Sequence, residues 1–237
     1  MKNKTNFLRL PLLFMGVFLF FAISCDKDDD NDINGKECVD ADGNVYETVK
    51  IGDQEWMAEN LKTTTYNDGT DLPNVTDSDD WGELETGAYA WYDNDVSNKD
   101  VYGALYNWYA VETGNLCPDG WRVPTDDDWT ELTDYLGGAE VAGGKLKATG
   151  TIEAGTGLWH EPNTGATNET GFAALPGGAR HFEGHFIAMG SAGVWWTSTA
   201  HSVTGTAWRF DMSYDSAVLK EEFAYKTYGF AVRCIKN

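Results

Sequence analysis

The segment 121–129 constrains the fold most, because it specifies where a strand ends and a helix begins. A short strand is expected to stop at Pro124, which has no N–H to donate to a neighbouring strand. Thr125 is a favoured N-cap residue, and Asp128 three positions later completes a capping box. The pattern predicts a helix after Thr125 that ends at Gly137-Gly138.

Other elements surround this helix. A hairpin is predicted from Val45–Ile51 and Gln54–Met57, joined by the turn Gly52-Asp53. Helical spacing of apolar residues occurs in Val101–Glu112, and a second short helix is expected in Ala139–Ala148. The later strands are expected at Phe172–Leu175, His181–Ala188, Gly193–Thr199, Ala207–Met212, Ser216–Leu219 and Tyr228–Ile235. Strands, then helices, then a run of strands indicate an α+β domain.

The N-terminus carries features of export. Three basic residues precede an apolar run at residues 10–23, which is shorter than the roughly 20 residues that a membrane span needs. The run fits a signal peptide covering residues 1–24. Ala22-Ile23-Ser24-Cys25 resembles a bacterial lipobox, which implies that Cys25 is lipidated and becomes the mature N-terminus. An ordinary signal peptide with an incidental cysteine, or an uncleaved anchor, remains the alternative.

Residues 25–37 form an acidic stretch that cannot bury apolar surface, so we expect a solvated tether. Asp26–Asp32 also resembles the acidic signal that directs Bacteroidetes-type lipoproteins to the outer face of the outer membrane. A plain charged spacer is the alternative. The expected location is therefore the outer membrane, through a lipid anchor, with the domain 38–237 at the cell surface.

The chain is strongly acidic. Its formal net charge is −21, and residues 1–24 contribute three positive and no negative charges to it. An acidic protein repels phosphate backbones, so no nucleic-acid partner is expected. Neutral or cationic ligands suit the charge better, although solubility alone is also a sufficient reason for it.

Three cysteines follow the leader: Cys38, Cys117 and Cys234. An oxidising compartment favours a disulfide, and an odd number leaves one thiol over. We favour Cys117–Cys234, with Cys38 free or competing, but the sequence leaves the pairing open. No Cys-x-x-Cys or His-rich spacing indicates zinc, so no metal site is predicted.

Several stretches together resemble the Fibrobacter succinogenes major paralogous domain, in order from Val39 to Lys236. They are Asp42–Tyr46, Val49–Leu61, Tyr102–Trp108, Cys117–Thr125, Gly171–Gly178, Trp195–Thr199 and Val232–Cys234. The resemblance implies an exported, often lipid-anchored protein with a C-type lectin-like fold. In such a fold, two or more helices accompany a run of short antiparallel strands and long loops.

The same resemblance leads to the formylglycine-generating enzymes, which use two cysteines spaced by five near the C-terminus. Cys234 matches the second cysteine, but Gly229 stands where the first would be. A dithiol copper site cannot form without its partner thiolate. The resemblance therefore implies neither formylglycine-generating activity nor a copper site for this chain.

Lectin-like folds present ligands on the long loops after the second helix. On that resemblance, the binding-face candidates are Trp159, His160, Arg180, His181, His185, Trp208 and Arg209. Tryptophan ring faces suit sugar C–H groups and cations, although tryptophans within predicted elements are expected in the core. His181 and His185 are four apart in an expected strand and turn, so they are not read as a metal pair on one helix face.

No cofactor is expected, with calcium as the alternative. Asp93-Asn94-Asp95 offers hard oxygen ligands, and Glu161-Pro162-Asn163 matches half of the sugar-binding lectin signature, but no Trp-Asn-Asp follows it. The chain also lacks a Gly-x-Ser-x-Gly elbow, a His-Glu-x-x-His pair and a phosphate loop. The sequence thus predicts an extracellular binding module for a glycan or protein ligand. The alternatives are a structural adhesin or assembly component, and an enzyme of unrecognised chemistry.

Overall fold

The computed structural model describes residues 38–237. The predicted signal peptide, Cys25 and the acidic tether fall outside the described residues. Within the described range, no helix combines the length and apolarity needed to cross a bilayer.

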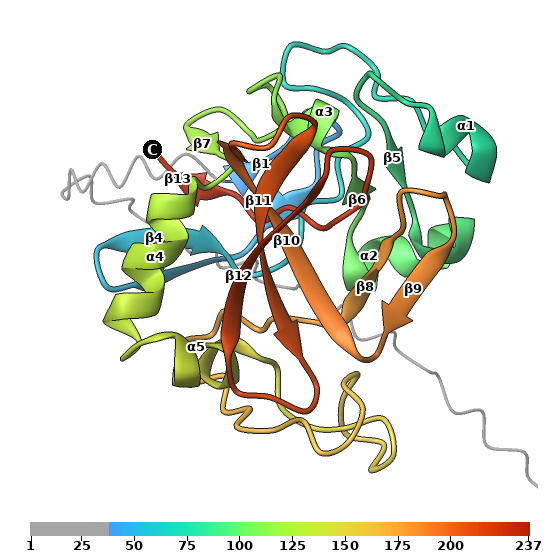
Figure 1. Cartoon of the computed structure of the whole chain (residues 1–237). Coiled ribbons are helices and arrows are strands. Elements are labelled where there is room, and N and C mark those ends of the chain that lie inside the picture. The colour runs from blue at the N-terminus through green and yellow to red at the C-terminus, as the bar shows by residue number, and fades with distance from the viewer. Residues whose placement is uncertain (1–37) are drawn as a thin grey trace, which may run out of the picture. The chain divides into compact units, whose positions relative to one another are not determined.

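A five-stranded sheet occupies the C-terminal part of the chain and appears in orange to red in Figure 1. Its strand order is β12-β11-β10-β8-β9, with β8 and β10 parallel and the other neighbours antiparallel. The strands are β8 (Gly177–Arg180), β9 (Phe186–Met189), β10 (Ala192–Ala200), β11 (Thr206–Ser213) and β12 (Leu219–Tyr225).

A four-stranded sheet brings both ends of the domain together, in the order β3-β4-β13-β7. Its strands are β3 (Thr48–Ile51), β4 (Gln54–Met57), β7 (Trp121–Arg122) and β13 (Ile235–Lys236). Two small ribbons add β1 (Cys38–Val39) with β2 (Val45–Tyr46), and β5 (Tyr89–Ala90) with β6 (Leu105–Tyr106). A disulfide joins Cys117 to Cys234, with Cα atoms 6.0 Å apart, while Cys38 is a buried free thiol.

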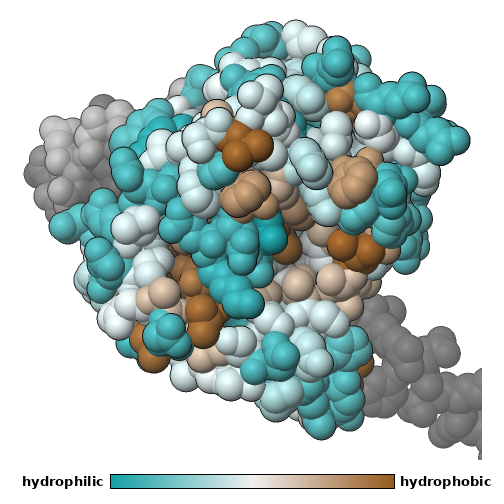
Figure 2. All heavy atoms as spheres, viewed as in Figure 1, coloured by the Kyte–Doolittle hydropathy of each residue, from teal (hydrophilic) through white to brown (hydrophobic). Residues whose placement is uncertain are grey.

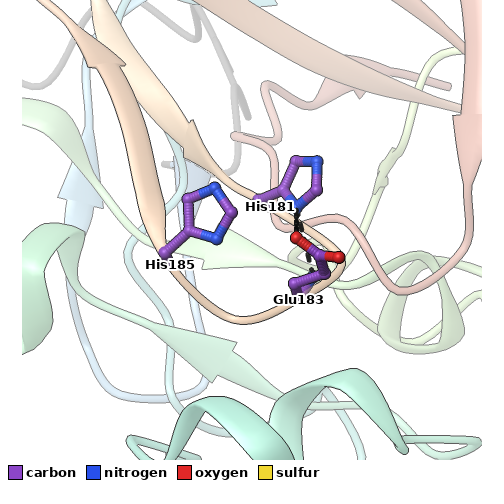
Figure 3. A group of neighbouring side chains, drawn as sticks. All are labelled: His181, Glu183 and His185. Atoms are coloured by element: carbon purple, nitrogen blue, oxygen red, sulfur yellow. Dashed lines mark hydrogen bonds and ion pairs between the residues drawn. The ribbon is translucent and has the colours of Figure 1, made fainter.

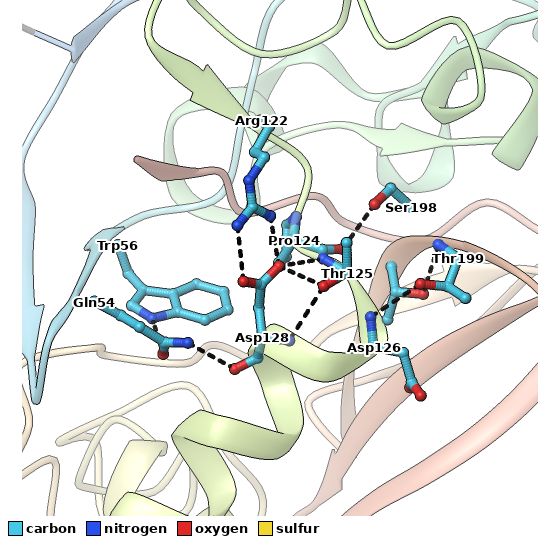
Figure 4. A network of polar contacts seen from close by, with 10 residues as sticks. Gln54, Trp56, Arg122, Pro124, Thr125, Asp126, Asp128, Ser198 and Thr199 are labelled. Atoms are coloured by element: carbon cyan, nitrogen blue, oxygen red, sulfur yellow. Dashed lines mark hydrogen bonds and ion pairs between the residues drawn. The ribbon is translucent and has the colours of Figure 1, made fainter. Parts of the chain in front are cut away.

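The predicted helix after Thr125 is confirmed as α4 (Asp126–Tyr135), with its capping box. The Thr125 backbone N–H donates to the Asp128 carboxylate at 2.6 Å, and the Asp128 N–H donates back to the Thr125 hydroxyl at 3.2 Å. Arg122 adds two further hydrogen bonds to the same carboxylate, at 2.5 and 2.8 Å (Figure 4). This network ties the end of β7 to the start of α4.

The remaining helical segments are short apart from α5 (Ala139–Leu146), which confirms the second predicted helix. They are α1 (Ser78–Gly82), α2 (Lys99–Tyr102), α3 (Trp108–Val111) and the 3₁₀ segments η1 (Tyr92–Asn94) and η2 (Val96–Asn98). Helices and antiparallel sheets in this arrangement confirm the α+β class.

Some predicted boundaries are wrong. The helix expected across Val101–Glu112 is interrupted by β6, because Gly103 has φ +73° and packs directly against Asn60, where a Cβ would lie 2.7 Å from the Asn60 Cβ. The strand expected at Phe172–Leu175 makes only an isolated bridge, and the strand expected to begin at Tyr228 starts at Ile235. In each case tertiary contacts override the local pattern.

The hydrophobic core lies on both faces of the five-stranded sheet. Adjacent residues of a strand point to opposite faces, and Trp195 and Trp196 on β10 enter different clusters accordingly. On the helix side, Trp129 of α4 stacks on Phe210 of β11 with ring centroids 5.2 Å apart. The tryptophans expected in the core, which are Trp56, Trp108, Trp121, Trp129, Trp195 and Trp196, are all buried. The other face of this sheet is only partly covered.

Candidate functional site

An open groove of about 480 Å³ crosses the five-stranded sheet. Figure 2 shows hydrophobic side chains gathered on the surface between β12 and β9. All five strands and the segments beside them contribute to the lining, through Ala179, Ile187, Ala188, Ala192, Val194, Val203, Thr206, Arg209, Asp211, Phe223, Ala224, Tyr225, Tyr228 and Phe230. The groove is mostly apolar, with one charged pair within it.

That pair is Arg209 and Asp211, which are two residues apart on β11 and so point to the same face. Arg209 Nη1 lies 2.9 Å from Asp211 Oδ1, and each side chain is about one-fifth exposed, 21% and 19%. Burial raises the pKa of the Asp211 carboxyl, Arg209 opposes that rise, and Glu222 adds to it. Arg209 Nε has no hydrogen-bond partner among the described residues. The groove therefore offers a carboxylate acceptor next to guanidinium donors.

Aromatic side chains flank this pair. Tyr228 stacks on Phe230, with ring centroids 5.3 Å apart, and both line the groove. Phe223 and Tyr225 of β12 are 47% and 56% exposed, which is unusual for large rings. Burial raises the pKa of the Tyr228 phenol, so its hydroxyl is protonated at neutral pH. Tyr225 and Tyr228 thus present rings in the same groove as the polar pair, whereas the Phe223 ring stacks on His201 with centroids 4.1 Å apart.

The turn between β8 and β9 carries three further polar side chains, His181, Glu183 and His185 (Figure 3). The His181 N–H donates to the His185 carbonyl at 2.8 Å, which makes them partners across the turn. Their rings stack with centroids 4.4 Å apart, and His181 Nδ1 lies 3.5 Å from Glu183 Oε2. Burial and the neighbouring His185 lower the pKa of His181. His181 also meets the edge of Tyr228, at 5.0 Å between centroids, which connects this turn to the groove.

The predicted binding residues do not form one face. Arg209 lines the groove, and His181 and His185 lie on the adjoining turn. Trp208 precedes Arg209 and lies edge-on to the ring of His201 at 4.5 Å, in a separate cluster with Phe223. His160 lies elsewhere, where it pairs with Glu153 at 2.8 Å.

Trp159 and Arg180 were wrong as binding candidates, because both are completely buried. The Trp159 indole N–H donates to the Ala174 carbonyl at 3.0 Å inside the core, so its loop folds over the hydrophobic cluster rather than presenting the ring. Arg180 is held by backbone carbonyls: Gly184 at 2.8 Å, Thr76 at 3.1 Å, Asp77 at 3.0 Å, and Val75. Both side chains organise loops and are not available to a ligand.

The segment Glu161-Pro162-Asn163, which matches half of the sugar-binding lectin signature, contributes to the structure of its loop. Asn163 is 6% exposed, and its amide donates to the carbonyls of Ala148 and Gly150 at 3.0 and 2.9 Å. In the other oxygen-rich segment, Asp95 accepts a hydrogen bond from the Ser97 N–H at 2.9 Å and caps η2. The Asn163 amide N–H groups and the Asp95 carboxylate thus shape their loops, whereas the buried Asn163 Oδ1 has no hydrogen-bond partner among the described residues.

Sequence reasoning missed Asp211, Tyr228 and Phe223 as groove residues. The position of Asp211 could have been inferred from the sequence. It is two residues from Arg209 in an expected strand, and alternate residues of a strand share a face. Tyr228 gave no such signal, because its position depends on the turn in which its N–H donates to the Tyr225 carbonyl at 3.0 Å.

Comparison with known proteins identifies the family. The model of the Fibrobacter succinogenes major domain matches residues 49–236, most of the described chain. No curated protein matches the sequence, and no solved structure matches the fold. The chain therefore belongs to the Fibrobacter succinogenes major domain family.

Proposed function

We propose that this domain is an extracellular binding module that holds a short, neutral saccharide in the groove across the five-stranded sheet. The observation that carries the proposal is the Arg209–Asp211 pair in one groove with the exposed ring of Tyr225 and the half-buried ring of Tyr228. The groove volume of about 480 Å³ lies within the usual range for small-ligand sites.

A saccharide matches both chemical features of the groove. Its C–H faces pack on aromatic rings, for which Tyr225 and Tyr228 are available. Its neighbouring hydroxyls both donate and accept, and so can bond to the Asp211 carboxylate and the Arg209 guanidinium together.

Charge selects against anionic ligands. The chain carries a net charge of −21, and Glu221 and Glu222 lie on β12 beside the groove. An acidic glycan or a phosphate-bearing ligand would meet repulsion on approach, whereas a neutral sugar would not.

The proposal includes the setting and the finer fold. The lipobox at Cys25 and the acidic tether that follows support an outer-membrane lipoprotein with its domain at the cell surface. The motif resemblance from Val39 to Lys236 supports a C-type lectin-like version of the α+β fold. Palmitate labelling of cells, compared with the Cys25→Ala variant, tests the anchor.

Saccharide binding is tested by isothermal titration of the full-length protein, in mild detergent, against a panel of neutral mono- and oligosaccharides. Tyr228→Ala and Arg209→Gln should each weaken binding of any hit about tenfold or more, by removing a stacking face or a charged hydrogen-bond donor. Tyr135→Ala and Lys145→Gln serve as matched controls. Tyr135 is 65% exposed on α4, and Lys145 is a half-buried ion-pair partner of Glu169 on α5.

Binding that survives both groove variants would place the ligand elsewhere. An absence of binding across the panel, with a cooperative thermal unfolding transition in the same sample, would reject the saccharide. A protein ligand would then become the leading class, tested with the same groove variants.

A further inference from the structure

We propose that His181, Glu183 and His185 form a binding site for one Zn²⁺ ion on the turn between β8 and β9. The site is independent of the saccharide proposal, since it uses none of the groove's polar residues. The sequence alone predicts a strand and turn at these histidines and favours no metal site there.

The turn places the three ligands side by side. Arg180 of β8 pairs with Phe186 of β9. His181 and His185 are the next residues toward the turn, so they face each other across the ends of the two strands. Glu183 lies between them at the turn. One ligand atom from each residue falls within 4.8 Å of the others.

Coordination requires the exposed His185 side chain to rotate out of its stack on His181, because an imidazole binds a metal in the plane of its ring. A tetrahedral zinc ion with bonds of about 2.0–2.1 Å holds its ligand atoms roughly 3.4 Å apart. Exposed side chains close such a gap by rotation, and Glu183 is 65% exposed while His185 is also exposed. A zinc ion on His181 Nδ1 would replace its contact of 3.5 Å with Glu183 Oε2 and the hydrogen bond of 3.3 Å that it accepts from the Glu183 backbone N–H.

The backbone beneath the ligands is already fixed. The buried Arg180 guanidinium holds the Gly184 carbonyl at 2.8 Å and the backbone of residues 75–77 at its other nitrogens. Gly184 has φ +86° and lies against Ser78, where a Cβ would be 2.4 Å from the Ser78 Cα. The His181 ring is held between Phe182 and Tyr228, with ring centroids 4.1 and 5.0 Å away. The ion would therefore bind without ordering a loop, which lowers the entropy cost.

Ligand chemistry selects the ion. Two imidazoles and one carboxylate suit zinc, whereas calcium and magnesium prefer oxygen ligands alone. Three protein ligands leave the fourth tetrahedral position to water, as in an open zinc site. The net charge of −21 favours the approach of cations to the protein as a whole.

The test is isothermal titration of ZnCl₂ into the full-length protein in detergent, after EDTA treatment and its removal. We expect one Zn²⁺ per chain. We also expect a loss of affinity of at least tenfold in His185→Ala and in Glu183→Gln, and no comparable binding of CaCl₂.

His160→Ala is the matched control, because His160 also pairs with a glutamate, Glu153, at 2.8 Å on an exposed surface. It should bind Zn²⁺ as the unmodified protein does. Thermal unfolding gives a second readout: Zn²⁺ should raise the melting temperature of the unmodified protein and of His160→Ala, but not that of His185→Ala. Because His185 is exposed, its variant should melt normally without zinc, so a folding failure is recognised separately.

Three results would overturn the site. The first is that the protein binds no stoichiometric zinc. The second is that His185→Ala binds zinc as the unmodified protein does, and the third is that His160→Ala loses zinc binding instead. The last two would assign the ion to the acidic tether or to the His160–Glu153 pair.

Discussion

Arg209 and Asp211 form an ion pair within the groove, with Nη1 2.9 Å from Oδ1, on the face of β11 opposite Phe210. Phe210 fixes the strand against α4, so the pair belongs to a rigid element rather than to a loop. The pair is incompletely satisfied, since Arg209 Nε has no hydrogen-bond partner among the described residues. The Nε atom itself is buried, so a polar ligand would meet only the remaining exposed fifth of each side chain.

Arg209→Gln should raise the pKa of Asp211 further above its usual value. Burial and Glu222 already raise it, and Arg209 is the main opposing influence. The gap between the pKa of Asp211 in the native state and its pKa in the unfolded chain would therefore become wider. Carboxyl carbon chemical shifts followed by NMR against pH measure this directly. An unchanged or lower pKa in the variant would show that the pair does not interact as described.

Arg180→Met should destabilise the protein by about 3–5 kcal/mol, the range expected when one partner of a buried polar network is removed. The side chain is fully buried and satisfies carbonyls from two segments far apart in sequence, around Val75 and at Gly184. Arg180→Lys should recover little of this, because an ammonium group cannot reproduce the planar set of donors. Urea unfolding measures both variants. A stable Arg180→Met protein would contradict the structural role given to this residue.

The sequence allowed the local elements to be predicted better than the site. The capping box at Thr125 and the hairpin turn at Gly52 are encoded within a few residues, so both were foreseen. The groove depends on strands paired over long separations, and so do the positions of Trp159 and Arg180. A polar loop sequence around Trp159 gives no sign that the ring folds back under Ala174. Likewise, the expected strand and turn at His181 and His185 did not show that the two residues pair across the turn, where the His181 backbone N–H donates to the His185 carbonyl.

Asp126→Asn should change the pH dependence of stability. Burial, with Glu221 and Asp127, raises the pKa of Asp126 to about 6. A raised pKa means that the native state keeps a proton which the unfolded chain loses near pH 4, so this group lowers stability as pH rises from about 4 to about 6. After allowance for solvent screening, the effect is about 1 kcal/mol.

The free energy of unfolding of Asp126→Asn, relative to the unmodified protein, should therefore increase between pH 4 and pH 7. Urea unfolding at several pH values provides the comparison. Glu131→Gln, a variant on the same helix, controls for general charge removal. A difference that stays flat with pH would argue against a strained Asp126 carboxylate.

Cys38 should resist alkylation in the folded protein. It is 4% exposed, and burial together with Asp40 raises the pKa of its thiol to about 12, so the reactive thiolate is scarce at pH 8. Iodoacetamide labelling followed by mass spectrometry should modify Cys38 only after denaturation. Rapid labelling of the native protein at this cysteine would contradict its burial.

The central claim is that a neutral saccharide occupies the groove on the five-stranded sheet. The most direct measurement is NMR of the full-length protein with ¹³C-labelled alanine methyl groups, titrated with a neutral oligosaccharide. Ala179, Ala188, Ala192 and Ala224 line the groove, whereas Ala58 and Ala148 lie outside it and serve as internal references. The account predicts saturable shifts at the groove alanines, with the reference signals unchanged, and loss of those shifts in Arg209→Gln. Saturable shifts confined to alanines outside the groove, or none with any neutral saccharide, would contradict it.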